Sequence, residues 1–100
     1  MTKRKIPLAT PGEILLEEFL EPLGITQYRL AKEIGVPQRR IGEIVAGRRA
    51  ITADTAAHFG VFFGMEAEFW LNLQSHYDLV QTREAIADRL SEIQPLTEAA

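Results

Sequence analysis

The feature that most constrains the fold of this chain is a link of three residues between two helical patterns. The first pattern begins after Thr26, a favourable N-cap, and ends at Gly35. The second begins at Pro37 and runs to about Ala46. Because only Gly35-Val36-Pro37 lies between them, the two helices are expected to cross at a steep angle. The chain is therefore predicted to contain a tight two-helix corner.

Residues at fixed spacings indicate which kind of corner this is. With Gln27 as position one, a small residue, a glycine and two isoleucines fall at positions five, nine, fifteen and eighteen: Ala31, Gly35, Ile41 and Ile44. Alanine lets the second helix cross closely, glycine accepts a left-handed backbone, and isoleucines three apart anchor one helix face. This spacing is typical of a helix-turn-helix. An ordinary corner of an all-α bundle is the alternative, but it does not require the polar outer face described below.

Helical periodicity continues through the rest of the chain, without strand-like alternation. Further helices are predicted from Thr10 to Gly24, from Thr52 to about Phe63, and from near residue 66 toward Gln94. The last of these is either one rod or two helices. The fold class is therefore all-α with five helical segments. We divide the chain into an N-terminal flexible basic arm (1–9), a helix-turn-helix domain (10–79) and a C-terminal helical extension with a frayed end (80–100).

The outer face of the corner carries side chains suited to DNA. In a helix-turn-helix, residues at the start of the second helix lie at base edges in the major groove. Glutamine can bond adenine, arginine can bond guanine, and glutamate can accept from the cytosine amine. Three residues occupy positions suited to reading bases: Gln38, Arg39 and Glu43. Four others are better suited to contacting phosphates: Gln27, Arg40, Arg48 and Arg49.

The net charge of −3 argues against a nucleic-acid partner, but its distribution reverses that argument. Basic residues concentrate between Arg29 and Arg49, while acidic residues concentrate in the first helix and after residue 51. The basic band fits DNA, and the acidic flanks fit a basic protein. Lys3-Arg4-Lys5 is either an arm along the phosphates or a solubilising tail. Gly42, costly inside a helix, either lets the helix backbone approach DNA closely or is merely tolerated.

Several function classes are excluded by what the sequence lacks. It has no cysteine, so thiolate catalysis, disulfides and cysteine-based zinc sites are ruled out. His58 and His76 lie on different predicted helices without a set of metal ligands, and no nucleophile or phosphate-loop motif occurs. No apolar run is long enough for a membrane span, and no secretory signal follows the basic start. We therefore expect a cytoplasmic domain that is not an enzyme and that uses no cofactor or metal.

An apolar face continues along the last predicted helix, at Trp70, Leu73, Tyr77, Ile86 and Leu90. Such a face needs a cover. A second copy of the chain is the natural cover, because dimeric helix-turn-helix proteins place two recognition helices about 34–36 Å apart, one turn of DNA. These five residues are therefore predicted to contribute to a homodimer contact. The alternative is that the tail packs back on its own domain.

A series of motifs runs almost continuously through residues 11–79. They are Pro11-Gly12-Glu13-Ile14-Leu15, Glu17-Glu18-Phe19-Leu20-Glu21-Pro22-Leu23-Gly24, Arg39-Arg40-Ile41, Glu43-Ile44, Ile51-Thr52-Ala53-Asp54-Thr55-Ala56, Glu68-Phe69-Trp70-Leu71-Asn72-Leu73-Gln74 and Tyr77-Asp78-Leu79. In these motifs the chain resembles the HigA-type antitoxins, lambda-repressor-like helix-turn-helix proteins of the XRE type. The chain departs from these antitoxins at three places. The family often has His where Thr10 stands, Asn where Gly42 stands, and a Ser-Pro-like start where Glu66-Ala67 stands. The change at Gly42 puts a base contact from that position in doubt.

The resemblance implies a lambda-repressor-like five-helix domain with an extended C-terminal helix. It also implies an antitoxin that neutralises a RelE-like mRNA-cleaving toxin and, as a dimer, represses its own operon at a palindromic operator. A basic toxin would be attracted to an acidic surface, such as Glu17, Glu18 and Glu21 or the acidic second half. Two other functions stay open. One is a repressor without a toxin, and the other is an interaction module that has lost DNA binding.

Overall fold

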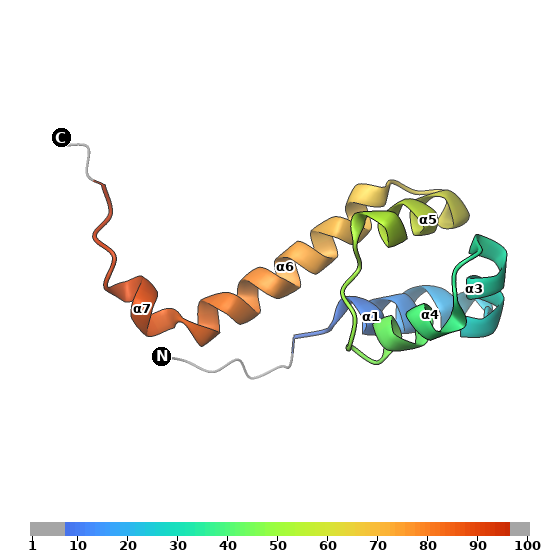
Figure 1. The fold of residues 1–100 in the computed structure, drawn as a ribbon, viewed down its shortest axis with the longest axis horizontal. Helices are drawn as coiled ribbons and strands as arrows, with labels where there is room; N and C mark the ends of the chain where they lie inside the picture. Colours follow the sequence, from blue (N-terminus) through green and yellow to red (C-terminus); the bar gives the residue numbers. More distant parts are fainter. Residues whose placement is uncertain (1–7, 97–100) are drawn as a thin grey trace.

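The computed structural model describes residues 8–96, and every regular element in that range is helical (Figure 1). The elements are α1 (Pro11–Ile14), the π-helix η1 (Leu15–Leu20), α2 (Glu21–Leu23), α3 (Gln27–Ile34), α4 (Gln38–Val45), α5 (Ala53–Phe63), α6 (Ala67–Ala85) and α7 (Ala87–Ser91). The predicted all-α class is confirmed. Lys3-Arg4-Lys5 and residues 97–100 of the predicted frayed end lie outside the described residues.

The first predicted helix is continuous but changes its winding twice. It begins in a capping box, in which Thr10 Oγ1 accepts from Glu13 N–H at 3.0 Å and Glu13 Oε1 accepts from Thr10 N–H at 2.9 Å. Its middle, η1, is wound as a π-helix. In a regular α-helix, the ring of Pro22 would clash with the carbonyl group four residues earlier, and the wider winding precedes it directly. Gly24, at φ 68°, ends the helix.

The predicted helix-turn-helix corner is present as α3 and α4. The Thr26 hydroxyl caps α3 by accepting from Arg29 N–H at 3.0 Å, and Gly35 closes it with φ 75°. Three structural positions are buried where the helices cross, namely Ala31, Ile41 and Ile44. All four spacing residues therefore lie within this corner.

The core centres on aromatic side chains contributed by the first helix, α5 and α6. Trp70 is 0% exposed, and its ring centroid lies 5.1 Å from that of Phe59 and 4.8 Å from that of Phe19. The prediction that Trp70 contributes to a dimer contact was therefore wrong, because its side chain is fully covered within its own chain. The stripe from Trp70 to Leu90 is not one surface: its first member belongs to the core.

Gly12 brings the first helix into close contact with α4. A Cβ atom at this position would lie 1.8 Å from the Ile44 carbonyl oxygen and 2.9 Å from Val45 Cα. Only a residue without a side chain permits this approach. The position of α4 in the fold therefore depends on Gly12 as well as on its own isoleucines.

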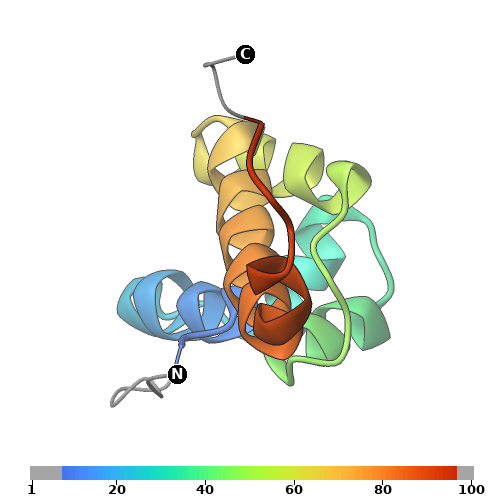
Figure 2. The same cartoon turned by 90° about the vertical axis from the view of Figure 1, so that its left-hand side faces the viewer.

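The outer part of α6 together with α7, here called the tail, gives the molecule an extended shape (Figure 1). Figure 2 looks along this long axis, with the orange and red tail in front of the domain body. The Cα radius of gyration is 17.1 Å, against about 13 Å for a compact chain of 100 residues. α6 crosses the predicted boundary at residues 79/80 without interruption, and the break falls at Ile86, with φ −118° and ψ 26°. Residues 66–94 therefore contain two helices rather than one rod. α7 lies at the far end of α6, so the tail does not fold back on its own body (Figure 1).

Within residues 8–96, the histidines and acids form no group able to hold a metal ion. His58 donates from Nδ1 to the Asp54 carbonyl oxygen at 2.7 Å, a local contact within α5. No helix in this part of the chain is both long enough and apolar enough to cross a membrane.

Candidate nucleic-acid interface

The first turn of α4 displays two of the predicted base-reading residues. Gln38 and Arg39 are exposed there, and the Arg39 side chain is 85% accessible. On the opposite face, Ile41 and Ile44 are buried in the core. The start of the recognition helix is thus open to solvent while the helix itself is firmly held.

Glu43, the third predicted base reader, joins two arginines of this face. Its Oε2 accepts from Arg39 Nε at 2.9 Å, and its Oε1 accepts from Arg49 Nε at 2.8 Å and forms an ion pair with Arg49 Nη2 at 2.8 Å. The Arg49 hydrogen bond, and after it that of Arg39, hold the pKa of Glu43 below its ordinary value. Both carboxylate oxygens are therefore engaged within the chain, and direct reading of cytosine by Glu43 stays a prediction.

Arg40, a predicted phosphate contact, pairs with an acid of its own chain. Its Nη1 donates to Asp54 Oδ2 at 2.7 Å and lies 3.5 Å from Thr55 Oγ1. The Arg40 side chain is only 27% exposed. The pair connects α4 to the start of α5. The sequence does not indicate this pair, because no local pattern links residues 14 apart.

The loop after α4 presents the remaining two arginines. Gly47 adopts φ 80°, and the Arg48 N–H donates to the Glu43 carbonyl oxygen at 2.8 Å, closing the helix end. Arg48 and Arg49 are both exposed. Arg49 pairs with Glu43, whereas Arg48 has no carboxylate partner in the part of the chain that the structure describes. Arg48 therefore offers the most available positive charge of this face.

Gln74 holds this loop from the side of α6, a role that sequence reasoning missed. Its Oε1 accepts from the Ile51 backbone N–H at 2.8 Å, and its Nε2 donates to Asp78 Oδ1 at 3.0 Å. Ile51 itself is buried. In the sequence, Gln74 stands out only as the last residue of a motif shared with the HigA-type antitoxins. That motif does not indicate which group Gln74 contacts.

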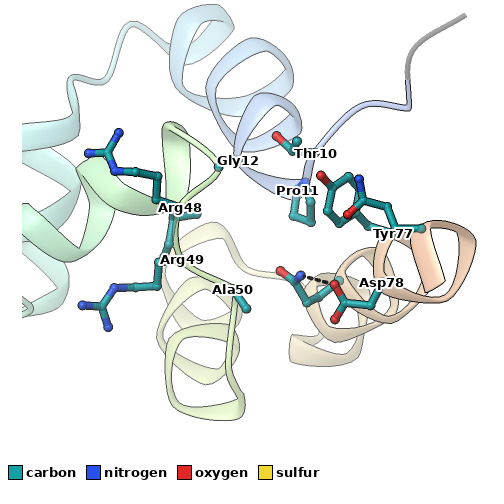
Figure 3. A pocket seen from close by; sticks show the side chains of 12 residues that line it. Thr10, Pro11, Gly12, Arg48, Arg49, Ala50, Tyr77 and Asp78 are labelled. Atoms are coloured by element: carbon teal, nitrogen blue, oxygen red, sulfur yellow. Dashed lines mark hydrogen bonds between the residues drawn. The ribbon is translucent and has the colours of Figure 1, made fainter. Parts of the chain in front are cut away.

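A hollow of about 250 Å³ lies beside this loop, between the start of α1 and α6 (Figure 3). Pro11, Ala50 and the half-buried Tyr77 are among its lining residues. Figure 3 shows the guanidinium groups of Arg48 and Arg49 pointing away from Tyr77 and Asp78. Arg48 and Arg49 also line the hollow, but their guanidinium groups are directed away from its Tyr77 side.

Gln27 and Gly42 meet between the two helices of the corner. Gln27 is half-buried, and a Cβ on Gly42 would lie 3.8 Å from Gln27 Oε1, an ordinary contact distance. Packing within the chain therefore does not require glycine at position 42.

The other predicted dimer residues differ in how far they are covered. Leu73 packs against the core, Tyr77 and Ile86 are half-buried, and Leu90 is 40% exposed. Leu79 and Ile93 add exposed apolar surface to the tail. A homodimer contact along the tail stays a prediction.

A short-linked corner, with a buried inner face and a basic outer face on its second helix, defines a helix-turn-helix domain. The family model described as helix-turn-helix matches residues 16–61. Virulence-associated protein I of Dichelobacter nodosus is 49% identical over 77 residues, which is 77% of this chain and 71% of that protein. Antitoxin HigA-1 of Vibrio cholerae is 36% identical over 96% of this chain and 90% of its own length.

Two solved structures share the fold closely. The Pseudomonas aeruginosa antitoxin HigA, determined with the higBA promoter, has a TM-score of 0.86 and 38% identity, covering 91% of this chain and all (100%) of that one. The antitoxin GraA in complex with its operator has a TM-score of 0.83 and 32% identity, covering 97% of this chain and 99% of that one. The chain belongs to the HigA antitoxin family of helix-turn-helix proteins.

Proposed function

We propose that this chain binds operator DNA through α4 and the loop behind it, represses its own operon, and neutralises a toxin. The observation that carries the DNA part is the exposed row of Arg39, Arg48 and Arg49 on a helix held rigidly by its buried face. The operator and promoter complexes of GraA and of the Pseudomonas HigA support it, since both relatives share this fold.

The DNA contacts divide between two groups. Gln38 and Arg39 read base edges, because the start of a recognition helix lies deepest in the major groove. Arg48, Arg49 and Gln27 contact phosphates, which fix position without reading sequence. Arg40 supports them indirectly, since its pair with Asp54 holds the recognition helix.

The tail supplies the homodimer contact in this proposal. Leu73 packs against the core and Tyr77 is half-buried beside the start of α1, whereas Ile86 and Leu90 lie toward the outer end of the tail. A second copy can cover the apolar parts of these four residues that stay accessible. A palindromic operator requires two such corners.

The toxin is proposed to be a basic, RelE-like mRNA-cleaving protein. Glu17, Glu18 and Glu21 are all exposed on the first helix. A basic partner is attracted to such a surface, and the attraction mainly accelerates association. This partner class comes from the resemblance to HigA-type antitoxins.

Two measurements test the proposal. The purified protein should shift its own promoter fragment, with an affinity that falls steeply as salt increases. Co-expression with the product of the neighbouring gene should yield a co-purifying complex. A promoter shift without co-purification would indicate a repressor without a toxin, and co-purification without a shift would indicate an interaction module.

A further inference from the structure

An acid lies within the face that is proposed to meet phosphates. Glu43 stands on α4 between Arg39 and Arg49, with contacts of 2.9 and 2.8 Å. A carboxylate at this place repels DNA phosphates, so its presence needs a physical reason.

Stabilisation of α4 by an i,i+4 ion pair does not by itself explain why a carboxylate stands at position 43. Arg29 and Glu33 on α3 form the same i,i+4 pair, at 3.2 Å, with both side chains about half exposed. Glu33 holds one arginine through one oxygen and lines a surface hollow together with Ala57 and Val61 of α5. Glu43 is less exposed, at 21%. It uses both oxygens and holds an arginine from a different segment.

The ion pairs also limit the free positive charge of this face. Arg40 is paired with Asp54, while Arg39 and Arg49 share Glu43. Within residues 8–96, only Arg48 among these four arginines has no carboxylate partner. Sequence-independent affinity follows the number of phosphates neutralised, so this arrangement keeps it low.

The ion pairs of Glu43 affect specific and non-specific DNA binding differently. Arg39 uses Nε for Glu43, which leaves its two Nη groups, the pair that bonds guanine, pointing onward. A guanine in register can therefore be read with the ion pair intact. Swinging Arg39 or Arg49 to an arbitrary phosphate breaks the pair and leaves a bare carboxylate beside a phosphate.

We propose that Glu43 is a positioning residue that determines DNA specificity by holding Arg39 and Arg49 in one arrangement and opposing binding that breaks it. The proposal rests on the proposed DNA-binding function. It differs from direct base reading, because Glu43 acts through the two arginines.

The test compares wild type, E43Q and E33Q by fluorescence anisotropy on two duplexes, across a series of KCl concentrations. One duplex carries the promoter upstream of this gene, and the other is a scramble of equal length and composition. E43Q should bind the scramble about tenfold more tightly, with a log–log salt slope steeper by about one, because one more arginine reaches a phosphate. Promoter binding should change by less than about threefold, because removal of the repelling carboxylate charge offsets the loss of arginine positioning, so the ratio of affinities falls roughly tenfold.

E33Q is the matched control, since it changes the same charge and breaks the same kind of pair away from α4. It should leave the affinity ratio unchanged. The proposal is overturned if E43Q changes both duplexes by one factor, or if E33Q reproduces the effect. If wild type itself does not distinguish the duplexes, the DNA-binding function fails and this proposal fails with it.

A second variant distinguishes the effect of the carboxylate charge from the effect of the side-chain length at position 43. E43D keeps the charge, but its side chain is too short to hold both arginines. It should bind the promoter more weakly while the scramble affinity stays as in wild type. Equal behaviour of E43D and wild type on the promoter would contradict a positioning role.

Discussion

The side-chain oxygen of Gln74 on α6 accepts a hydrogen bond from the backbone N–H of Ile51, 2.8 Å away. Ile51 follows the exposed Arg48 and Arg49 by only a few residues. The helix that carries the tail is thereby tied to the loop that carries two proposed phosphate contacts. This contact fixes the far end of the loop, whose near end is held to α4 by the hydrogen bond from Arg48 N–H to the Glu43 carbonyl oxygen.

Removing this acceptor should destabilise the fold. Gln74→Ala leaves the Ile51 N–H without a partner in a part-buried position, which costs about 1–3 kcal/mol. Urea unfolding followed by circular dichroism measures the loss. Gln81→Ala, an exposed change on the same helix, is the control and should lie within about 0.5 kcal/mol of wild type. Equal midpoints for the two variants would contradict the role of Gln74.

Two glycine-to-alanine changes should have opposite effects. Gly12→Ala places a Cβ 1.8 Å from the Ile44 carbonyl oxygen, so backbone must move, at a cost of about 3 kcal/mol or more. Gly42→Ala meets only Gln27 Oε1 at 3.8 Å and should stabilise α4 by about 0.5–1 kcal/mol. Thermal melts of both variants check the pair. A stabilised Gly12→Ala protein would show that α1 does not approach α4 this closely.

Three arginines of the DNA face should differ in what their replacement by alanine changes. Arg39→Ala should cost about 1–3 kcal/mol on the promoter and relax specificity, as expected for a base contact. Arg48→Ala should weaken all duplexes alike and reduce the salt slope by about one. Arg40→Ala should lower the melting temperature, since its partner is Asp54. A salt slope reduced by Arg40→Ala in a protein of unchanged stability would restore its assignment as a phosphate contact.

The pKa of Glu43 should report the ion pairs directly. Because the folded-state pKa is lowered, the pairs contribute stability above the unfolded-state pKa, and that contribution is lost as the pH falls through the folded-state pKa. Carbon-13 NMR titration of the carboxyl group should therefore give a midpoint below that of an ordinary glutamate. Arg49→Ala should raise it most, Arg39→Ala less, and Arg48→Ala hardly at all. An unchanged midpoint in Arg49→Ala would rule out the pair as the cause.

The tail should control the oligomeric state. Leu90→Asp puts a charge on the proposed contact and should convert a dimer to a monomer in light scattering at micromolar concentration. Val61→Asp adds the same charge at an apolar residue of α5 that is 86% exposed, and it should leave the mass unchanged. A wild-type protein that is monomeric under these conditions would falsify the homodimer.

Sequence reasoning succeeded where the determinants are local. Helix ends depend on contacts within one turn of the capping residue, so the residue type there predicts them. This holds for the N-caps Thr10, Thr26 and Thr52 and for Gly35 at the end of α3. The helix-turn-helix spacing is local in the same sense, since the whole corner spans about twenty residues.

It failed where a partner is distant along the chain. Trp70 fits an apolar stripe that suggests an interface, but Phe19 and Phe59 cover its ring. The pair of Arg40 with Asp54 was likewise not predicted, because the two residues lie 14 apart along the chain. The phosphate contact of Arg40 stays a prediction. Helical periodicity identifies a face, and only the fold shows what lies opposite that face.

The buried residues of the described chain end at Trp70, although α6 continues to Ala85. Substitutions in the outer half of α6 and in α7 can therefore accumulate without repacking the body. Given the proposed homodimer contact on the tail, this freedom allows the tails of related copies in one cell to diverge until each copy pairs only with itself. Their shared recognition corner can meanwhile keep its architecture, so insulation between paralogues can evolve separately from the choice of DNA site.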